Sequence, residues 1–273
     1  MRSLSQLFRH KNCNIIGMLH LPALPGTPAS SCSIKEIMEK VEEETRIYLE
    51  SGVDGLILEN MHDTPYCLAR DLEPHITATM AVLASRVRNL VRDSSVPVGV
   101  QVLAGGNREA VAVAQAAGLQ FVRAEGFVFS HVADEGWMEG CAGPLLRYRA
   151  NIGAAEVRVL CDIKKKHSAH SVTADVSIAE TARAAGFFRA DGVIVTGGST
   201  GDPADTRELE QVREAVPSLP VLVGSGVRAE NLRSYSRATA AIIGSEFKRD
   251  GWWENELCPD RIRAVMDEAK RLR

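Results

Sequence analysis

The sequence lacks a long apolar run, an excess of charge of either sign and any closely spaced cysteine pair. No stretch approaches the roughly 18 to 20 continuous apolar residues of a membrane-spanning helix, so we expect no membrane attachment. The 32 Lys and Arg residues nearly balance the 35 Asp and Glu residues, which gives a formal net charge of −3 at pH 7. Because no long basic segment is present either, a nucleic-acid-binding protein is not expected. The 273 residues are 45% hydrophobic and 25% charged, as in an ordinary globular protein, which excludes a disordered or fibrous chain.

The cysteines also exclude some chemistry. They are scattered along the chain without a C-x-x-C pair, which gives no zinc or redox motif: Cys13, Cys32, Cys67, Cys141, Cys161 and Cys258. We therefore expect free, buried thiols in a reducing compartment. Residues 1–12 are basic and faintly similar to an organelle transit peptide, but an apolar strand begins near Asn14 and leaves little to remove. The cytoplasm is the predicted location.

What the sequence does have is a repeated alternation of strand-like and helix-like segments. Short apolar runs predict eight strands, at residues 14–19, 55–58, 98–103, 121–124, 157–163, 192–195, 221–223 and 240–243. Helix starts are marked by two capping boxes, Ser33 with Glu36 and Ser177 with Glu180, by Asn107 as a cap and by Pro144. Eight strand–helix units in this length favour one closed (β/α)8 barrel over a doubly wound α/β sheet. We predict a single domain over residues 1–273, with an insertion at about 126–143 after the fourth strand.

Two aromatic segments fall outside this repeat. The insertion contains residues 127–131 (FVFSH) and Trp137, and we interpret it as a lid or a contact between subunits. The pair Trp252 and Trp253 is expected to anchor the last helix, about residues 260–272, against the barrel bottom or a partner subunit. Both segments are compatible with a homo-oligomer.

Polar residues gather where the strands end, which is where such barrels carry their active sites. In the fifth strand the apolar residues Val157, Val159, Cys161 and Ile163 should face the helices, so Arg158, Leu160, Asp162 and Lys164 should point inward. The same alternation turns Glu59, Gln101, Arg123, Glu125, Thr196 and, less directly, His20 toward the barrel interior. Several buried ionisable groups need mutual pairing, a metal or a polar ligand. A network that merely packs the barrel mouth is the alternative to a functional site.

Acid–base chemistry would suit this ring of side chains. Glu59, Glu125 and Asp162 are the candidate acids and bases, because mixed burial and charge pairing separate pKa values. Lys164 is the candidate electrostatic or imine-forming group. We expect its neighbour Lys165 to lie in solvent at the end of a loop.

The last strands end in glycine-rich loops, at Gly224-Ser225-Gly226 and Gly244-Ser245. Backbone amides in such loops can approach an anion, and the loops after strands seven and eight form the recurrent phosphate site of these barrels. The loop at residues 197–201, with Gly197 and Gly198, is expected either to close the same pocket or to be a flexible lid without ligand contact.

A metal site is a weaker alternative. Glu59, His62 and Asp63 are suitable ligand types, but their spacing matches no standard cage, and a hydrogen-bonded loop pair of His62 and Asp63 is favoured. No cofactor and no metal ligand set are predicted, and a divalent metal is kept as a lesser alternative.

Six segments together resemble the BtpA family, also called BtpA/SgcQ. They are residues 17–28 (GMLHLPALPGTP), 59–66 (ENMHDTPY), 162–167 (DIKKKH), 195–203 (VTGGSTGDP), 221–227 (VLVGSGV) and 242–251 (IIGSEFKRDG). The resemblance spans nearly the whole chain and implies a TIM barrel related to phosphate-binding barrels. The family name comes from a role in photosystem I biogenesis in cyanobacteria. Residues 101–107 and 123–126 depart from the usual family pattern.

The sequence is therefore compatible with three functions. The leading prediction is an enzyme acting on a small phosphorylated metabolite, a sugar phosphate or a nucleotide-like compound, by isomerisation, aldol-type cleavage or hydrolysis. The first alternative is a non-catalytic assembly or biogenesis factor that keeps an inherited barrel. The second alternative is a metal-dependent hydrolase.

Overall fold

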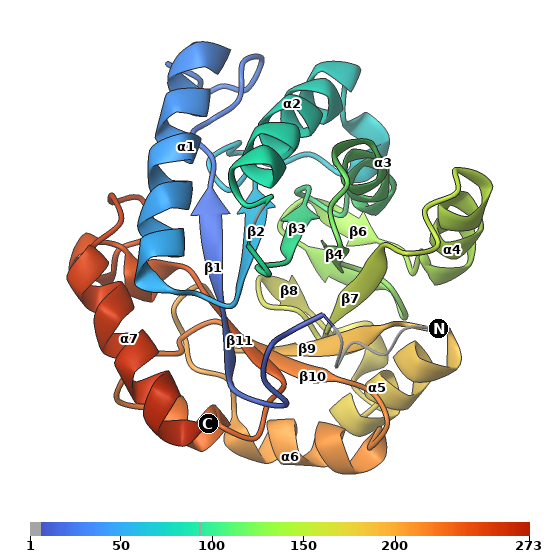
Figure 1. Cartoon of the computed structure of the whole chain (residues 1–273). Helices are drawn as coiled ribbons and strands as arrows, with labels where there is room; N and C mark the ends of the chain where they lie inside the picture. Colours follow the sequence, from blue (N-terminus) through green and yellow to red (C-terminus); the bar gives the residue numbers. More distant parts are fainter. Residues whose placement is uncertain (1–6, 93) are drawn as a thin grey trace.

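A closed barrel of eight parallel strands forms the centre of the molecule (Figure 1). The structure is a computed structural model that describes residues 7–92 and 94–273. The barrel strands are β1 (Asn14–His20), β2 (Gly55–Glu59), β3 (Val98–Gln101), β4 (Phe121–Ala124), β7 (Arg158–Ile163), β9 (Gly192–Thr196), β10 (Val221–Gly224) and β11 (Ala240–Ile243). The strands follow one another in sequence order, and the pairing of β1 with both β2 and β11 closes the ring. The predicted (β/α)8 barrel is confirmed.

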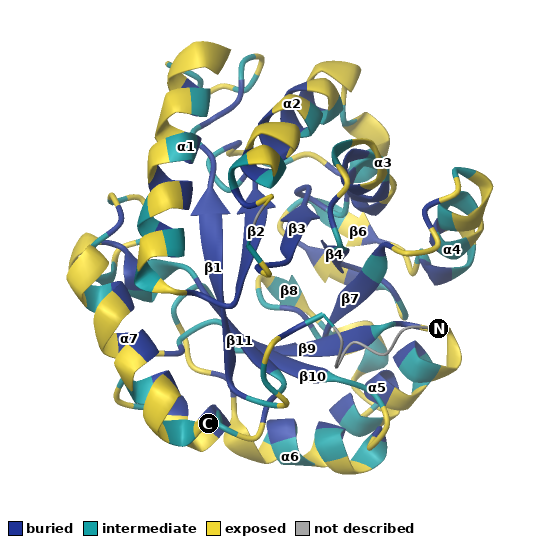
Figure 2. Cartoon of the chain, in the orientation of Figure 1, coloured by how far each residue is buried: buried dark blue, intermediate teal, exposed yellow. Residues whose placement is uncertain are grey.

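Helices surround the barrel as an outer layer (Figure 1). They are α1 (Ile34–Ser51), α2 (Pro74–Leu90), α3 (Asn107–Ala117), α4 (Ala142–Asn151), α5 (Ile178–Phe187), α6 (Thr206–Ala215) and α7 (Pro259–Leu272). Short 3-10 turns lie in the loops: η2 (Ala69–Asp71), η3 (Ser171–Thr173), η4 (Leu232–Tyr235), η5 (Ser245–Phe247) and η6 (Arg249–Gly251). Each long helix turns its buried face to the strands and its exposed face to solvent (Figure 2). Among the described residues, no helix combines the length and the apolar character that crossing a bilayer requires.

The helix starts show where local sequence rules hold and where they fail. Both capping boxes form as predicted, with Ser33 and Ser177 each accepting from the third helical amide while Glu36 and Glu180 bond back. Asn107, by contrast, does not cap α3. Its side chain bonds both backbone groups of Glu125, donating to the carbonyl at 2.6 Å and accepting from the amide at 3.1 Å. The cap prediction was wrong because a contact with the end of β4 takes the side chain away from its own helix.

Apolar side chains form two layers, one between strands and helices and one inside the barrel. In β7, Val159, Cys161 and Ile163 belong to the outer layer and Leu160 to the inner one, so the predicted alternation is confirmed. The inner layer consists of Phe8, Ile16, Met18, Ile57, Phe121, Leu160, Ile194, Leu222, Ala240 and Ile242. Phe8 packs edge-on against Phe121, with ring centroids 6.3 Å apart, and fills the barrel at the start of the strands. The basic segment at the N-terminus lies partly outside the described residues, because its first six are not among them.

The predicted insertion folds into a small antiparallel sheet. Strands β5 (His131–Ala133) and β6 (Gly136–Met138) form a hairpin, and β8 (Ser168–Ala169) pairs with β5. Ala133 and Met138 of this hairpin join Leu103 and Ala104, which follow β3, in a satellite apolar cluster. The hairpin is therefore attached to the mouth of the barrel, where a lid would lie.

Candidate functional site

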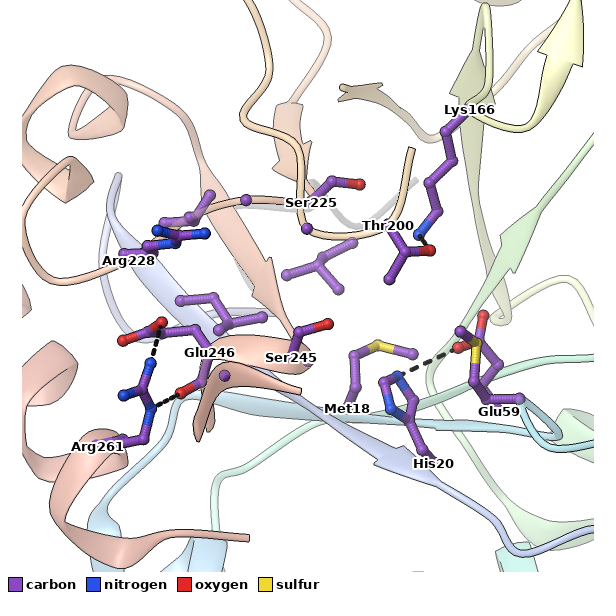
Figure 3. A pocket seen from close by; sticks show the side chains of 18 of the residues that line it. Met18, His20, Glu59, Lys166, Thr200, Ser225, Arg228, Ser245, Glu246 and Arg261 are labelled. Atoms are coloured by element: carbon purple, nitrogen blue, oxygen red, sulfur yellow. Dashed lines mark hydrogen bonds and ion pairs between the residues drawn. The ribbon is translucent and has the colours of Figure 1, made fainter. Parts of the chain in front are cut away.

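A polar cavity of about 170 Å³ opens where the barrel strands end. Its walls come from β1, β2 and β4, from the loops after β7 and β9, and from the glycine-rich loops after β10 and β11 (Figure 3). The predicted residues His20, Glu59, Arg123, Ser225, Gly226, Gly244 and Ser245 all line it. The strand ends and glycine-rich loops therefore bring seven of the fifteen predicted site residues to one cavity.

His20 and Glu59 form a buried pair at the floor of this cavity (Figure 3). The His20 Nε2 and Glu59 Oε2 atoms are 3.4 Å apart. Burial first, and then the positive charge of Lys248, hold the pKa of His20 well below its usual range, so the imidazole is neutral at pH 7. Burial raises the pKa of Glu59, although Arg123 opposes this. A neutral imidazole beside a carboxyl of raised pKa is an arrangement suited to proton transfer with a ligand.

Gly244 makes room for this pair. A Cβ at position 244 would lie 2.7 Å from Cε1 of His20, closer than a real contact allows. The glycine after β11 therefore serves the packing of His20 as well as the loop that it opens.

Arg123 and Asp162 form a buried two-pronged ion pair between β4 and β7. The Arg123 Nε and Nη2 atoms donate to the two Asp162 carboxylate oxygens at 3.0 and 2.9 Å. Burial works against the charge of Arg123, but Asp162 outweighs it, so the pKa of Arg123 is raised above its usual value. Because both carboxylate oxygens are engaged, Asp162 holds the cation in place and is less available as an acid or base than Glu59.

Glu125 is occupied as well. It accepts a hydrogen bond from the amide of Gly105 at 2.9 Å and lies 3.5 Å from Nζ of Lys165. The expectation of a solvent-exposed Lys165 was wrong, since only 6% of this residue is exposed. The ion pair with the Glu125 carboxylate holds the Lys165 side chain at the barrel mouth.

Lys166 takes the place in the cavity that the strand alternation assigned to Lys164. Strand β7 ends at Ile163, and Lys164 has a φ of 44°, which breaks the alternation. Lys164 donates to the carbonyl of Thr173 at 3.1 Å and lines a separate small hollow. Lys166 lies in the main cavity and donates to Oγ1 of Thr200 at 3.0 Å (Figure 3). Burial, followed by repulsion from Arg123, lowers the pKa of Lys166.

The loop after β9 contributes differently from the expectation. Thr200 and Gly201 line the cavity, whereas Gly197 and Gly198 do not. A Cβ at Gly197 would lie 2.2 Å from the carbonyl oxygen of Asp202, so this glycine is needed for the turn itself. Thr196 is buried, and its hydroxyl accepts a hydrogen bond from the Lys166 amide at 3.2 Å.

The loops after β10 and β11 form the end of the cavity suited to an anion. Oγ of Ser225 is buried without a hydrogen-bond partner among the described residues. Gly226 has a φ of 60°, and a Cβ there would lie 2.2 Å from the nitrogen of Pro203, so only glycine fits. Gly224 is the last residue of β10, and a Cβ there would lie 3.7 Å from Nη2 of Arg123. Ser245 completes this wall (Figure 3).

Two further cations at this end were not predicted from the sequence. Arg228 and Arg261 both line the cavity, and Arg261 is paired with Glu246 (Figure 3). Arg228 lies two residues after Gly226, so a search for cations beside glycine-rich strand ends would have found it. Arg261 lies in α7, and nothing in its local sequence signals the cavity.

A second hollow of about 250 Å³ adjoins the first. The two share Glu59, Met61, Arg123, Lys166 and Thr200 as lining residues. Gln101, Glu125, Asp134, Glu135 and Trp253 border the second hollow alone. Trp253 is thus at the mouth and not at the barrel bottom, and Trp252 is 55% exposed, so the predicted anchoring at the bottom was wrong.

The three candidate metal ligands in the loop after β2 do not converge. His62 packs on the ring of Trp253, with centroids 4.9 Å apart. Asp63 accepts hydrogen bonds from the Leu24 amide at 2.7 Å and from Nδ2 of Asn60 at 2.9 Å. Within the described ranges, no group of three or more His, Cys, Asp or Glu side chains is arranged to hold a metal ion.

Comparison with known proteins gives one family and one fold. The model of the BtpA family matches residues 11–271. A Caenorhabditis elegans protein named "Uncharacterized protein F13E9.13, mitochondrial" is 49% identical over 98% of this chain and 97% of its own length. The Synechocystis "Photosystem I biogenesis protein BtpA" is 32% identical over 97% of this chain and 90% of its own length.

The solved structures that the chain resembles include TIM-barrel enzymes of low identity. Phosphoribosyl anthranilate isomerase from Thermus thermophilus superposes with a TM-score of 0.57 at 13% identity, over 95% of this chain and all of that one. Orotidine 5′-monophosphate decarboxylase from Methanocaldococcus jannaschii superposes with a TM-score of 0.55 at 11% identity, over 95% of this chain and 99% of that one. At such identities the likeness concerns the fold.

Proposed function

The chain belongs to the BtpA family, and within this family we propose that it is an enzyme acting on a small phosphorylated metabolite at the mouth of its TIM barrel. The observation that carries this proposal is that one cavity joins two kinds of wall. Glycine-rich loops with Ser225 and Ser245 form one side, and the buried acid–base pair His20–Glu59 lies beside them (Figure 3).

Phosphate would bind at the loops after β10 and β11. The hydroxyls of Ser225 and Ser245 can donate to phosphate oxygens, as can the backbone amides of lining residues such as Gly226. Arg228 adds a positive charge at this end. The names of the two enzymes of similar fold contain phosphorylated compounds, which supports the same class of ligand here.

Proton transfer would fall to Glu59 and His20. Burial raises the pKa of Glu59, which favours its use as a general acid or base. Lys166 replaces Lys164 as the electrostatic or imine-forming group, because its pKa is lowered and it faces the cavity. Arg123, held by Asp162, would stabilise negative charge that develops on the substrate. These roles fit isomerisation, aldol-type cleavage or hydrolysis of a phosphate ester.

The test of phosphate binding is a thermal stabilisation series with ribose 5-phosphate and glucose 6-phosphate. We expect the wild-type protein to gain thermal stability with a phosphorylated sugar but not with the free sugar. The double variant Ser225→Ala/Ser245→Ala should lose most of this gain. The exposed Ser234→Ala in η4 is the matched control and should keep it. No stabilisation of the wild type by any phosphate ester would contradict the proposal.

An assembly factor is the second candidate, favoured by the name of the Synechocystis relative. It predicts that Glu59→Gln and Asp162→Asn leave the protein's cellular role intact, because no reaction would depend on them. Complementation of a null strain by these two variants, compared with wild type, separates the candidates. Full complementation together with recovery of a specific partner would favour assembly.

The remaining associations are proposals of the same kind. We place the protein in the cytoplasm as a homo-oligomer without a resident cofactor, a nucleic-acid partner or a membrane partner.

Trp137 and Val132, opposite each other on the exposed face of the hairpin, are the candidate contact between copies. Light scattering measures the oligomeric state, elemental analysis the metal content, and a tagged chain in cells the compartment. The name of the C. elegans relative places that protein in mitochondria. Mitochondrial import of the tagged chain would overturn the proposed location.

A further inference from the structure

Gln101 is a buried residue whose side-chain amide oxygen lacks a hydrogen-bond partner among the described residues. It ends β3 beside Glu59 of β2, with which it is in register, and only 2% of the residue is exposed. Its Oε1 is buried and has no partner among the described residues. Burying a polar atom without a partner costs stability, so such an atom at a cavity wall points to a ligand that supplies the missing donor.

The hollow that Gln101 lines has flat and apolar groups among charged ones. Met61, Tyr66, Leu103 and Trp253 are the flat and apolar borders, and the charged borders are Glu59, Arg123, Glu125, Asp134, Glu135, Lys165 and Lys166. The wall groups are held before any ligand arrives: Tyr66 donates its hydroxyl hydrogen to the carbonyl of Met61, and the ring of Trp253 packs on His62. Aromatic rings and a thioether pack well on the face of a planar group.

The position of this hollow relative to the phosphate loops defines the shape of its ligand. Both hollows are bordered by Glu59, Arg123 and Lys166, so these groups lie between the Ser225–Gly226 end and the Gln101 end. A ligand that spans both hollows would carry phosphate at one end and a planar group at the other, with its reacting atoms beside Glu59 and Lys166. A bare sugar phosphate would leave the second hollow and Gln101 without a partner.

We infer that the second hollow is the subsite for a planar nitrogen heterocycle, so the substrate is a nucleotide-like phosphate ester whose ring N–H donates to Oε1 of Gln101. The inference rests on the proposed function, because it assumes phosphate at the loops after β10 and β11. It adds the class of the second group and makes Gln101 a specificity-determining residue.

Calorimetric titration with two kinds of probe tests the inference. The probes are ribose 5-phosphate and the four common nucleoside 5′-monophosphates, each added to the wild-type protein. We expect at least one nucleotide to bind about tenfold more tightly than ribose 5-phosphate, the effect of roughly one good directional contact. Gln101→Leu should remove this advantage and leave ribose 5-phosphate binding unchanged. Gln115→Leu, on the exposed side of α3, is the matched control and should keep it.

Two further measurements guard against a misfolded variant. Without ligand, Gln101→Leu should be at least as thermally stable as wild type, because it removes a buried unmet oxygen; a purely structural glutamine would give the opposite result. Trp253→Ala, at the half-buried rim, should weaken nucleotide binding about tenfold and again spare ribose 5-phosphate.

The outcomes separate this inference from the proposed function. If ribose 5-phosphate binds but no nucleotide binds more tightly, or if Gln101→Leu weakens both probes equally, the heterocycle subsite is refuted and the phosphate site stands. If no phosphate ester of any kind binds, the proposed function fails and the subsite fails with it.

Discussion

At the scale of single residues, buried polar atoms without a hydrogen-bond partner are concentrated at the barrel mouth. Among the described residues, such buried atoms belong to His20, Gln101, His131, Glu135 and Ser225. His131 borders the small hollow beside Lys164, and the other four line one or the other main hollow. Because each costs stability, their common location at the mouth supports the proposed ligand site.

Lys166 and Lys164 give a direct comparison of the two lysine positions. Lys166→Met should weaken the thermal stabilisation by ribose 5-phosphate severalfold, because it removes a cation from the cavity. Lys164→Met should leave it unchanged, because the Lys164 amine is bonded to the carbonyl of Thr173 outside the main cavity. Midpoint shifts against ligand concentration measure both, and equal effects would argue against the assignment of Lys166.

His131 makes stability depend on pH. Burial, and then the charge of Lys165, lower the pKa of His131 from 6.5 to about 4. The unfolded chain binds a proton on this imidazole below about pH 6.5, whereas the folded protein does not until about pH 4. Stability is therefore present above pH 6.5 and lost as the pH falls through this window, by about 2–3 kcal/mol from this residue.

Urea unfolding from pH 7 to pH 4 checks this prediction. His131→Gln should show a shallower loss of unfolding free energy over the window than wild type. His75→Gln is the control, because the His75 side chain is 43% exposed, and its slope should match wild type. A His131→Gln slope equal to that of wild type would place the pH dependence elsewhere.

At the scale of elements, the loops of the mouth are fixed by contacts made far from them in sequence. The segment after β11 is tied to α1 through Lys248 and Glu44, whose Nζ and Oε1 atoms are 2.9 Å apart and buried. The same segment supplies Ser245 to the first cavity and Trp253 to the second hollow. The ion pair thus positions two walls of the cavity.

Breaking this ion pair should destabilise the protein strongly. Lys248→Met leaves the Glu44 carboxylate buried without its partner, and we expect a loss of about 3–5 kcal/mol in unfolding free energy. The double variant Lys248→Met/Glu44→Leu should recover most of it, because no charge remains buried. Lys35→Ala, which removes an exposed pair with Glu39, should cost less than about 1 kcal/mol. Chemical denaturation measures all three, and a double variant as unstable as the single one would contradict the explanation.

At the scale of the whole molecule, apolar side chains fill the lower barrel, where the strands begin, and a polar cavity opens at the mouth, where the strands end. Phe8 closes the inner core at the start of the strands, against Phe121 and beside Gly55, where a Cβ would lie 3.3 Å from its ring. Above the layer of Ile16, Leu160 and Leu222, the interior side chains become polar. The apolar core is therefore concentrated in the lower barrel and the candidate site at its mouth.

Phe8→Ala should lower the unfolding free energy by about 3–5 kcal/mol, because it leaves a cavity in the inner core. It should not change the affinity for ribose 5-phosphate, since the mouth is at the other end of the strands. Phe187→Ala is the control, because this ring is 84% exposed and its loss should cost less than about 0.5 kcal/mol. Calorimetry on both variants checks the two effects, and a weakened ligand affinity in Phe8→Ala would show that the two ends are coupled.

The sequence alone determined the order of strands and helices, the closed barrel and the strand ends that carry the candidate site. It could do so because apolar periodicity and capping boxes are local properties, and because alternation along a strand assigns each residue to the interior or the helix layer. His20, Glu59, Arg123 and Asp162 were found in this way, since each lies within a regular strand.

Only the tertiary structure decided what happens beyond the strand ends. The turn at Lys164, the pairing of Lys165 with Glu125, the bonds of Asn107 to Glu125 and the place of Trp253 at the mouth all depend on contacts between segments distant in sequence. Beyond the last hydrogen bond between paired strands, the alternation of side chains no longer predicts which way a residue points. There, the position of a side chain follows from the partner that satisfies it, and the partners come from the folded barrel.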